Sequence, residues 1–151
     1  MPETKCGFND SANVSGSDLL AAFGPTLKVD IGFDSKFRPN GKNIPIAGIK
    51  GVNALVDTGA QECCIDNLLA ATLGLPIVDR QPISGSNGSH TTNIYQAQVH
   101  IPALNYTMTG RFAGVDLIAG GQSHTALIGR TFLKDFNMVY EGKTGTVTIS
   151  N

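Results

Sequence analysis

The feature of this sequence that most constrains its fold is a series of short apolar stretches separated by turn residues. Residues 26–33 alternate polar and apolar side chains, which is the pattern of a strand with one face in a core. Further strand candidates are bounded by glycine, proline, asparagine or aspartate, and they lie at residues 52–56, 63–65, 77–84, 92–101, 104–112, 126–129, 137–140 and 146–149. The pattern favours an all-β domain built as a small closed barrel.

Three short helices are expected between these strands. Residues 17–23 form the first, with Ser17 able to cap it and Gly24 ending it. Residues 67–73 form the second, because Asp66 suits the N-cap and Gly74 lies where a left-handed residue ends a helix. The third is expected at residues 130–136.

The length of 151 residues is enough for one domain with its own core. Residues 1–16 are polar and show no periodicity, so we expect them to form a mobile or loosely attached segment. The predicted organisation is an N-terminal arm with a short helix at residues 1–25, followed by a single domain at residues 26–151.

The charge of the chain and the length of its apolar stretches argue against two classes of partner. The formal net charge is −1 and 15% of the residues are charged, so we expect no nucleic-acid partner, which would call for a basic stripe. The apolar stretches are far shorter than the ~20 residues that cross a bilayer, so we expect no membrane partner. The first residues lack the basic and apolar regions of a secretory signal, and we therefore expect a cytoplasmic location.

The cysteines do not suggest a disulfide framework or a metal site. Cys6, Cys63 and Cys64 are odd in number, and two of them are adjacent. No cysteine or histidine pair has the spacing of a zinc site, so no metal and no cofactor are expected.

The segment with the most chemical content is Ala54–Ala60, where three apolar residues run into Asp57, Thr58 and Gly59. An ionisable residue directly after a buried strand would lie at the mouth of the core. An ordinary strand-to-turn junction could end in the same residues, because aspartate and glycine favour turns. A second apolar segment, 126–128, also runs into a glycine and a predicted helix, and a glycine-containing hairpin tip at 85–90 lies between the two.

Together these segments resemble the retropepsin-like aspartic proteases, the single-domain type found in retroviruses and in bacterial and eukaryotic relatives. The resemblance covers roughly residues 26–150 and rests on three landmarks in order. Residues 55–60 match the catalytic loop, residues 83–94 the flap, and residues 127–130 the segment before the C-terminal helix. The resemblance implies a closed-barrel-like retropepsin fold with short helices, working as a homodimer.

The resemblance also implies a set of site residues. The catalytic residues would be Asp57, Thr58 and Gly59, and Gly129 and Arg130 would support them from beneath. Substrate binding would fall to Ala60, Gln61, Glu62, Ile83, Gly85, Ser86, Asn87, Gly88 and Ile128. Apolar subsites are expected, because Val56, Ile83 and Ile128 would line the cleft.

The chain contains one Asp-Thr-Gly sequence, so a second carboxylate must come from another copy of the chain across a two-fold axis. Two carboxylates about 3 Å apart share one proton, and together they activate water and protonate a peptide carbonyl oxygen. The expected function is therefore an aspartic endopeptidase that cleaves an extended peptide at an Asp57 pair.

One departure from the family pattern leaves an alternative open. The family often carries acidic residues just after the catalytic loop, one of which pairs with the arginine of the C-terminal helix. Here those positions hold Gln61 and Glu62, so Arg130 has no usual partner unless Glu62 takes that role. The alternative function is a non-catalytic peptide-binding or dimerisation module on the same fold.

Overall fold

The computed structural model describes residues 2–38, 48–85 and 88–151. Its main body is a closed barrel, formed by β2 (Thr26–Gly32), β3 (Gly48–Val56), β8 (Ala126–Ile128), β4 (Cys64–Asp66), β7 (Tyr106–Val115) and β6 (Gly88–Ile101) in that spatial order. The barrel closes because β2 also pairs with β6, through the register Ile31↔Val99. The sequence-based expectation of an all-β closed barrel with short helices is confirmed.

Two parallel pairings set the direction of the segments around the site. β3 runs parallel to β8 with Val56 opposite Ile128, and β4 runs parallel to β7. The remaining neighbours in the barrel are antiparallel. Because parallel strands end at the same edge of a sheet, the segments that follow β3 and β8 emerge side by side.

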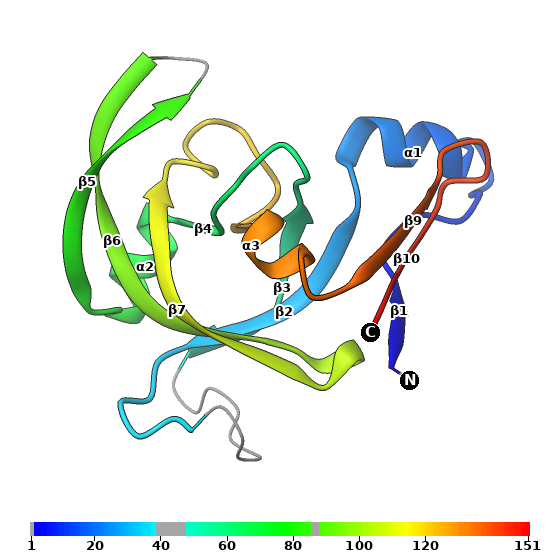
Figure 1. Ribbon diagram of the computed structural model, residues 1–151. Coiled ribbons are helices and arrows are strands. Elements are labelled where there is room, and N and C mark those ends of the chain that lie inside the picture. Colours follow the sequence, from blue (N-terminus) through cyan, green and yellow to red (C-terminus); the bar gives the residue numbers. More distant parts are fainter. Residues whose placement is uncertain (1, 39–47, 86–87) are drawn as a thin grey trace.

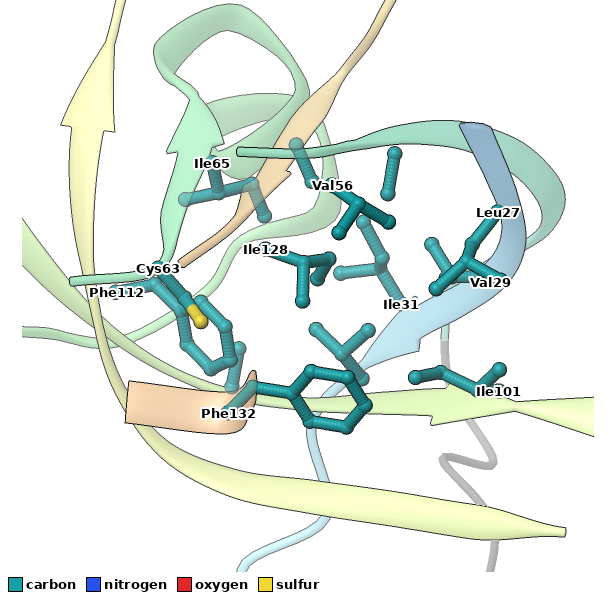
Figure 2. Close-up of a cluster of buried hydrophobic side chains, with 14 of the residues drawn as sticks. Leu27, Val29, Ile31, Val56, Cys63, Ile65, Ile101, Phe112, Ile128 and Phe132 are labelled. Atoms are coloured by element: carbon teal, nitrogen blue, oxygen red, sulfur yellow. The ribbon is translucent and has the colours of Figure 1, made fainter. Parts of the chain in front are cut away.

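The barrel interior is filled with aliphatic and aromatic side chains from every strand (Figure 2). Val29, Ile31, Ile101 and Ile128 have 1% of their surface exposed or less, and burial of such a side chain stabilises a fold by about 1.5–3 kcal/mol. Phe132, from the helix after β8, closes one end of this core.

The helices lie close to their expected positions, with local differences at their ends. α2 (Asn67–Leu73) is capped by Asp66, whose side chain accepts a hydrogen bond from the Leu69 N–H, and it ends at the left-handed Gly74. α1 (Gly16–Phe23) is capped by Ser15 and not by Ser17, because the Ser15 hydroxyl accepts from the Asp18 N–H. α3 (Arg130–Leu133) is shorter than expected, and η1 (Pro102–Leu104) is a short 3-10 helix that precedes β7.

The expected strands are present, and several have shifted ends. The strand expected at 92–101 begins at Gly88, where it extends the hairpin with β5 (Ile77–Gly85). The strand expected at 104–112 lies at Tyr106–Val115, since the chain first turns at Asn105 in a left-handed conformation. A final hairpin is formed by β9 (Asn137–Glu141) and β10 (Thr146–Ser150).

The N-terminal segment is not loosely attached, contrary to expectation. β1 (Glu3–Lys5) pairs antiparallel with β10, so the terminal sheet has the order β1-β10-β9. The N–H groups of Cys6 and Phe8 donate to the Val147 and Gly145 carbonyls. Gly7 lies so close to Gly145 that a Cβ atom would overlap its carbonyl oxygen. In Figure 1, α1 and this terminal sheet lie on the side of the barrel away from the β5–β6 hairpin.

Candidate active site

The segment after β3 is a tight turn that holds Asp57 at the end of the barrel. The Asp57 N–H continues the strand pairing by donating to the Ile128 carbonyl at 2.9 Å, and the Ala60 N–H donates back to the Asp57 carbonyl at 3.2 Å. The Asp57 carboxylate accepts a hydrogen bond from the Gly59 N–H at 2.9 Å. The side chain is half-buried, so one carboxylate oxygen is oriented by the turn itself while the group still reaches the surface.

A second segment crosses beneath this turn and fixes its backbone. The N–H groups of Arg130 and Thr131 donate to the Ala60 and Gln61 carbonyls at 2.9 and 3.0 Å. Gly129 permits the crossing, because a Cβ atom there would lie 2.5 Å from the Glu62 carbonyl oxygen. The turn is therefore held by main-chain bonds that leave its side chains available.

Arg130 braces the turn in an unexpected way. Its Nη1 donates to the Thr58 carbonyl oxygen at 2.7 Å. The ion pairs between described residues are Arg111–Asp79 and Lys134–Asp135, so Glu62 does not take the role of a carboxylate partner for Arg130. One of the five guanidinium N–H groups is thus paired with a backbone carbonyl and not with a carboxylate.

Cys63 supports the same crossing from inside the barrel. Its buried Sγ accepts from the Gly129 N–H at 3.3 Å and lies 3.7 Å from the Thr131 hydroxyl. Sequence reasoning considered Cys63 as a disulfide or metal-site candidate and missed this role. Its position beside the turn was the available signal, but the contact partner is 66 residues away.

A cavity of about 590 Å³ opens beside the turn, and we call it the flap pocket. It contains five of the expected substrate-contacting or catalytic residues, namely Gly59, Ala60, Gln61, Glu62 and Ile83. It also contains residues that sequence reasoning did not select, namely Cys64, Gln81, Pro82, Ser84, Ile94, Arg111 and Ala113. These come from β4, β5, β6 and β7, which the barrel brings to one place.

The β5–β6 hairpin forms one wall of the flap pocket and reaches past it. Its register runs through Ile83↔His90 and Ser84↔Ser89 to Gly85↔Gly88. In Figure 1 the hairpin projects at the same end of the barrel as the turn after β3. Gly85 and Gly88 lie beyond the residues that line the pocket. Ser86 and Asn87, two of the expected contact residues, lie outside the described residues.

The residues around this turn match a family of known proteins. Residues 43–135 match the family model described as "gag-polyprotein putative aspartyl protease", which covers more than half of the chain. The chain belongs to this aspartyl protease family. No curated protein matches the sequence significantly.

Three solved structures are similar to this aspartyl protease family member, and the one with a TM-score above 0.5 supports the same fold. A retropepsin-like aspartic protease from Rickettsia conorii has a TM-score of 0.53 and 13% identity, covering 97% of this chain and 89% of that chain. EIAV protease in complex with the inhibitor HBY-793 has a TM-score of 0.48 and 18% identity, covering 74% and 86%. The retroviral protease-like domain of Ddi1 from Leishmania major has a TM-score of 0.44 and 19% identity, covering 83% and 89%.

Ile128, another of the expected contact residues, does not line the pocket. Ile128 has no exposed surface, and Val56 is 3% exposed, because both side chains point into the barrel core. The expectation that these two residues line the cleft is corrected. The apolar lining comes instead from residues that include Pro82, Ile83 and Ile94.

The flap pocket holds both signs of charge. Arg111 donates to Asp79 at 2.8 Å, which ties β7 to β5 on a half-exposed face. Hydrogen bonds from the Gln81 side chain, the Arg80 N–H and then the Arg111 guanidinium hold the pKa of Asp79 below its usual value. Glu62 supplies a carboxylate at the pocket wall itself, whereas Asp79 lies outside the lining.

Cys64 is the other titratable group of the flap pocket. Burial, followed by the neighbouring Cys63, Asp57 and Glu62, raises the pKa of the Cys64 thiol to about 11. The thiol is therefore protonated near neutral pH and is a poor nucleophile. Among the described residues, no group of three His, Cys, Asp or Glu side chains is arranged to hold a metal ion.

In the described part of the chain, no helix has both the length and the apolar character needed to cross a bilayer.

Proposed function

We propose that this protein is an aspartic endopeptidase whose active site forms when two copies bring their Asp57 side chains together. The observation that carries this proposal is the placement of Asp57. Its carboxylate is half-buried, oriented by the Gly59 N–H, and held beside a cavity of about 590 Å³ below a hairpin. A carboxylate at an ordinary turn would not need a crossing segment, an arginine brace and an adjoining pocket.

The proposed chemistry uses one water molecule and two carboxylates. Like charges about 3 Å apart cannot both ionise easily, so the pair holds one proton over a wide pH range. The ionised carboxylate removes a proton from the water, and the protonated one donates to the carbonyl oxygen of the peptide. The chain has one Asp-Thr-Gly sequence, so the second carboxylate comes from the partner copy.

The neighbouring residues would prepare this pair. The Thr58 side chain is exposed at the turn and is available to form a hydrogen bond across the two-fold axis. Gly59 lines the flap pocket without a side chain, so a substrate backbone can approach Asp57 closely. Arg130 fixes the Thr58 carbonyl from below and thereby limits movement of the turn.

The flap pocket supports an extended peptide as the substrate. Its wall is a two-stranded hairpin, and an extended peptide can lie along such a wall with strand-like hydrogen bonds. Pro82, Ile83 and Ile94 offer an apolar surface to a substrate side chain. Closure of the hairpin over the peptide would shield the reaction from bulk water.

An exposed sheet edge supports pairing with a second copy. β9 lies at one edge of the terminal sheet and carries Val139 and Tyr140, which are 56% and 55% exposed. An exposed edge strand presents unpaired N–H and C=O groups that can pair with another chain. β9 follows α3 directly, and α3 begins at the Arg130 that braces the catalytic turn.

The test of the shared site is a mixing experiment. Wild-type and Asp57→Asn chains are unfolded together, refolded at a fixed total concentration, and assayed on a cleavable peptide. Random pairing with inactive mixed dimers gives activity that follows the square of the wild-type fraction, so equal parts leave about one quarter. A chain that works alone would leave about one half, and that linear dependence would overturn the shared site.

The same preparation distinguishes an enzyme from a non-catalytic module. Mass spectrometry of a peptide library after incubation with the wild-type protein should show defined cleavage sites that are missing with Asp57→Asn. A dimer that binds peptides and releases every one of them intact would contradict the proposed activity.

A further inference from the structure

A second cavity lies between the N-terminal arm and the barrel. It has a volume of about 430 Å³, and we call it the arm pocket. Its walls are formed by Gly7, Phe8, Phe23, Thr26, Lys28, Asn53, Ser123 and His124. None of these described residues belongs to the flap pocket.

The arm contributes two aromatic side chains to the arm pocket. The rings of Phe8 and Phe23 lie 6.1 Å apart and are tilted by 42° to each other. The Phe8 N–H is fixed by the Gly145 carbonyl, and the last turn of α1 is fixed because the Gly24 N–H donates to Leu20. Phe23 is nevertheless 49% exposed, so an aromatic surface is held in place and left accessible to a ligand.

The arm pocket and Asp57 lie on one face of β3. Side chains alternate along a strand, so Asn53, Leu55 and Asp57 share the outer face while Ala54 and Val56 are buried. Leu127 lies opposite Leu55 on the parallel strand β8, and both are half-buried. This outer face spans about 13 Å from Asn53 to Asp57 at roughly 3.3 Å per residue, which is about the length of four residues of an extended peptide.

The electrostatics of the arm pocket are simple. The Thr26 hydroxyl donates its one hydrogen to the Gly24 carbonyl and also lies 2.9 Å from His124 Nε2. Because that hydrogen is already used, His124 is assigned as the donor through Nε2, and Nδ1 of the neutral ring is unprotonated. Burial lowers the pKa of His124, which keeps the ring neutral near neutral pH. Lys28 is then the charged side chain among the described residues of the pocket, and Lys5 lines the adjoining depression that shares Thr26 and Lys28.

We propose that the arm pocket is a subsite for the peptide substrate that accepts an aromatic or large aliphatic side chain, with an acidic neighbour contacting Lys28. The inference rests on the proposed function, because it places the peptide on both sides of Asp57. The flap pocket holds one part of the peptide, and the outer face of Leu55 and Leu127 leads the other part to Phe8 and Phe23. The N-terminal arm thereby takes part in substrate selection.

The experiment measures selectivity and not activity alone. A peptide that the wild-type protein cleaves is varied to phenylalanine or alanine at each position within about four residues of the scissile bond, and kcat/KM is measured for each pair. The wild type should prefer phenylalanine about tenfold at one position on one side of the bond. Phe23→Ala should reduce that preference to about twofold and leave the preferences at the other positions unchanged.

Two control variants make the result specific. Val14→Ala removes an exposed apolar side chain of the arm that does not line the pocket, and it should keep the wild-type preference. Lys28→Gln should keep the preference for phenylalanine. In a second peptide pair that carries aspartate or alanine next to the phenylalanine, it should lose the wild-type preference for aspartate. An unchanged phenylalanine preference in a folded, active Phe23→Ala variant would overturn the subsite. A Phe23→Ala variant that dissociates in sedimentation velocity while keeping its selectivity would also overturn it, because the pocket would then face the partner copy.

A binding measurement separates the failure of this inference from the failure of the proposed function. Fluorescence anisotropy with Asp57→Asn reports occupancy without cleavage. The probes are fluorescently labelled peptides with phenylalanine or alanine at each position, and they do not have to be substrates of the wild type. If the wild type cleaves no peptide and the phenylalanine peptide still binds through Phe23, the proposed function fails and the subsite stands. If cleavage occurs and Phe23→Ala changes neither selectivity nor binding, the proposed function stands and the subsite fails.

Discussion

The turn at residues 57–60 and the N-terminal arm are both fixed by backbone contacts to a distant part of the chain, but they use their side chains in opposite ways. At the turn, bonds to Gly129–Thr131 hold the backbone while Asp57 is half-buried and Thr58 is exposed. At the arm, Cys6 and Leu20 are each 2% exposed and are buried in the core. Changes at the turn should therefore alter chemistry with little effect on folding, and changes inside the arm should alter stability.

The largest expected effect is at Asp57. Asp57→Asn should lower kcat/KM by about a thousandfold, because an amide cannot act as the general base. The free energy of unfolding from urea titration should be unchanged or higher, since the substitution removes charge at the proposed dimer axis. Full activity in this variant would contradict the proposed mechanism.

The next effect tests the arm. Gly145 has a φ of 79°, and a Cβ atom there would overlap the Gly16 backbone. Gly145→Ala should lower the free energy of unfolding by about 3 kcal/mol through left-handed strain and overlap together. The matched control is Gly121→Ala, which has a φ of 88° and no described atom within 4 Å of the new Cβ. Its cost should be about 1–2 kcal/mol. Equal losses in the two variants would show that the arm is not held at Gly145.

A smaller effect tests how the turn is braced. Arg130→Met removes the hydrogen bond to the Thr58 carbonyl and should lower kcat/KM about tenfold, with a stability change of about 1 kcal/mol or less. Glu62→Gln removes the carboxylate that would otherwise be the arginine's partner, and it should leave the position of the turn unchanged. If the double variant Arg130→Met with Glu62→Gln loses no more kcat/KM than Glu62→Gln alone, the Arg130 brace is contradicted.

The smallest effect concerns pH and links the two regions through His124. Burial lowers the pKa of His124 below 6.5, so the unfolded chain binds a proton that the folded chain does not. The stability contributed by the neutral ring is present above pH 6.5 and is lost as the pH falls toward the lowered folded pKa. His124→Gln should make the urea concentration at the unfolding midpoint depend less on pH between pH 7 and pH 5 than it does in the wild type. His90→Gln, at an exposed position on the hairpin, is the control and should keep the wild-type slope.

Much of the fold follows from local patterns in the sequence. The Asp66 cap, the left-handed Gly74 and the alternation of residues 26–32 lie within contiguous segments, so their signals are complete without tertiary contacts. β1 gave no such signal, because its three residues are all polar and it becomes a strand by pairing with β10.

The sequence by itself determined that Asp57 follows a run of apolar residues and lies two residues before a glycine, because those properties belong to neighbouring residues. Tertiary structure alone decided what surrounds the carboxylate. Arg130 reaches the Thr58 carbonyl across 72 residues, and Cys63 supports Gly129 across 66. Barrel closure points Ile128 into the core and brings Arg111 and Ile94 to the flap pocket. These contacts depend on how strands far apart in the sequence curve around one core, which no local pattern encodes.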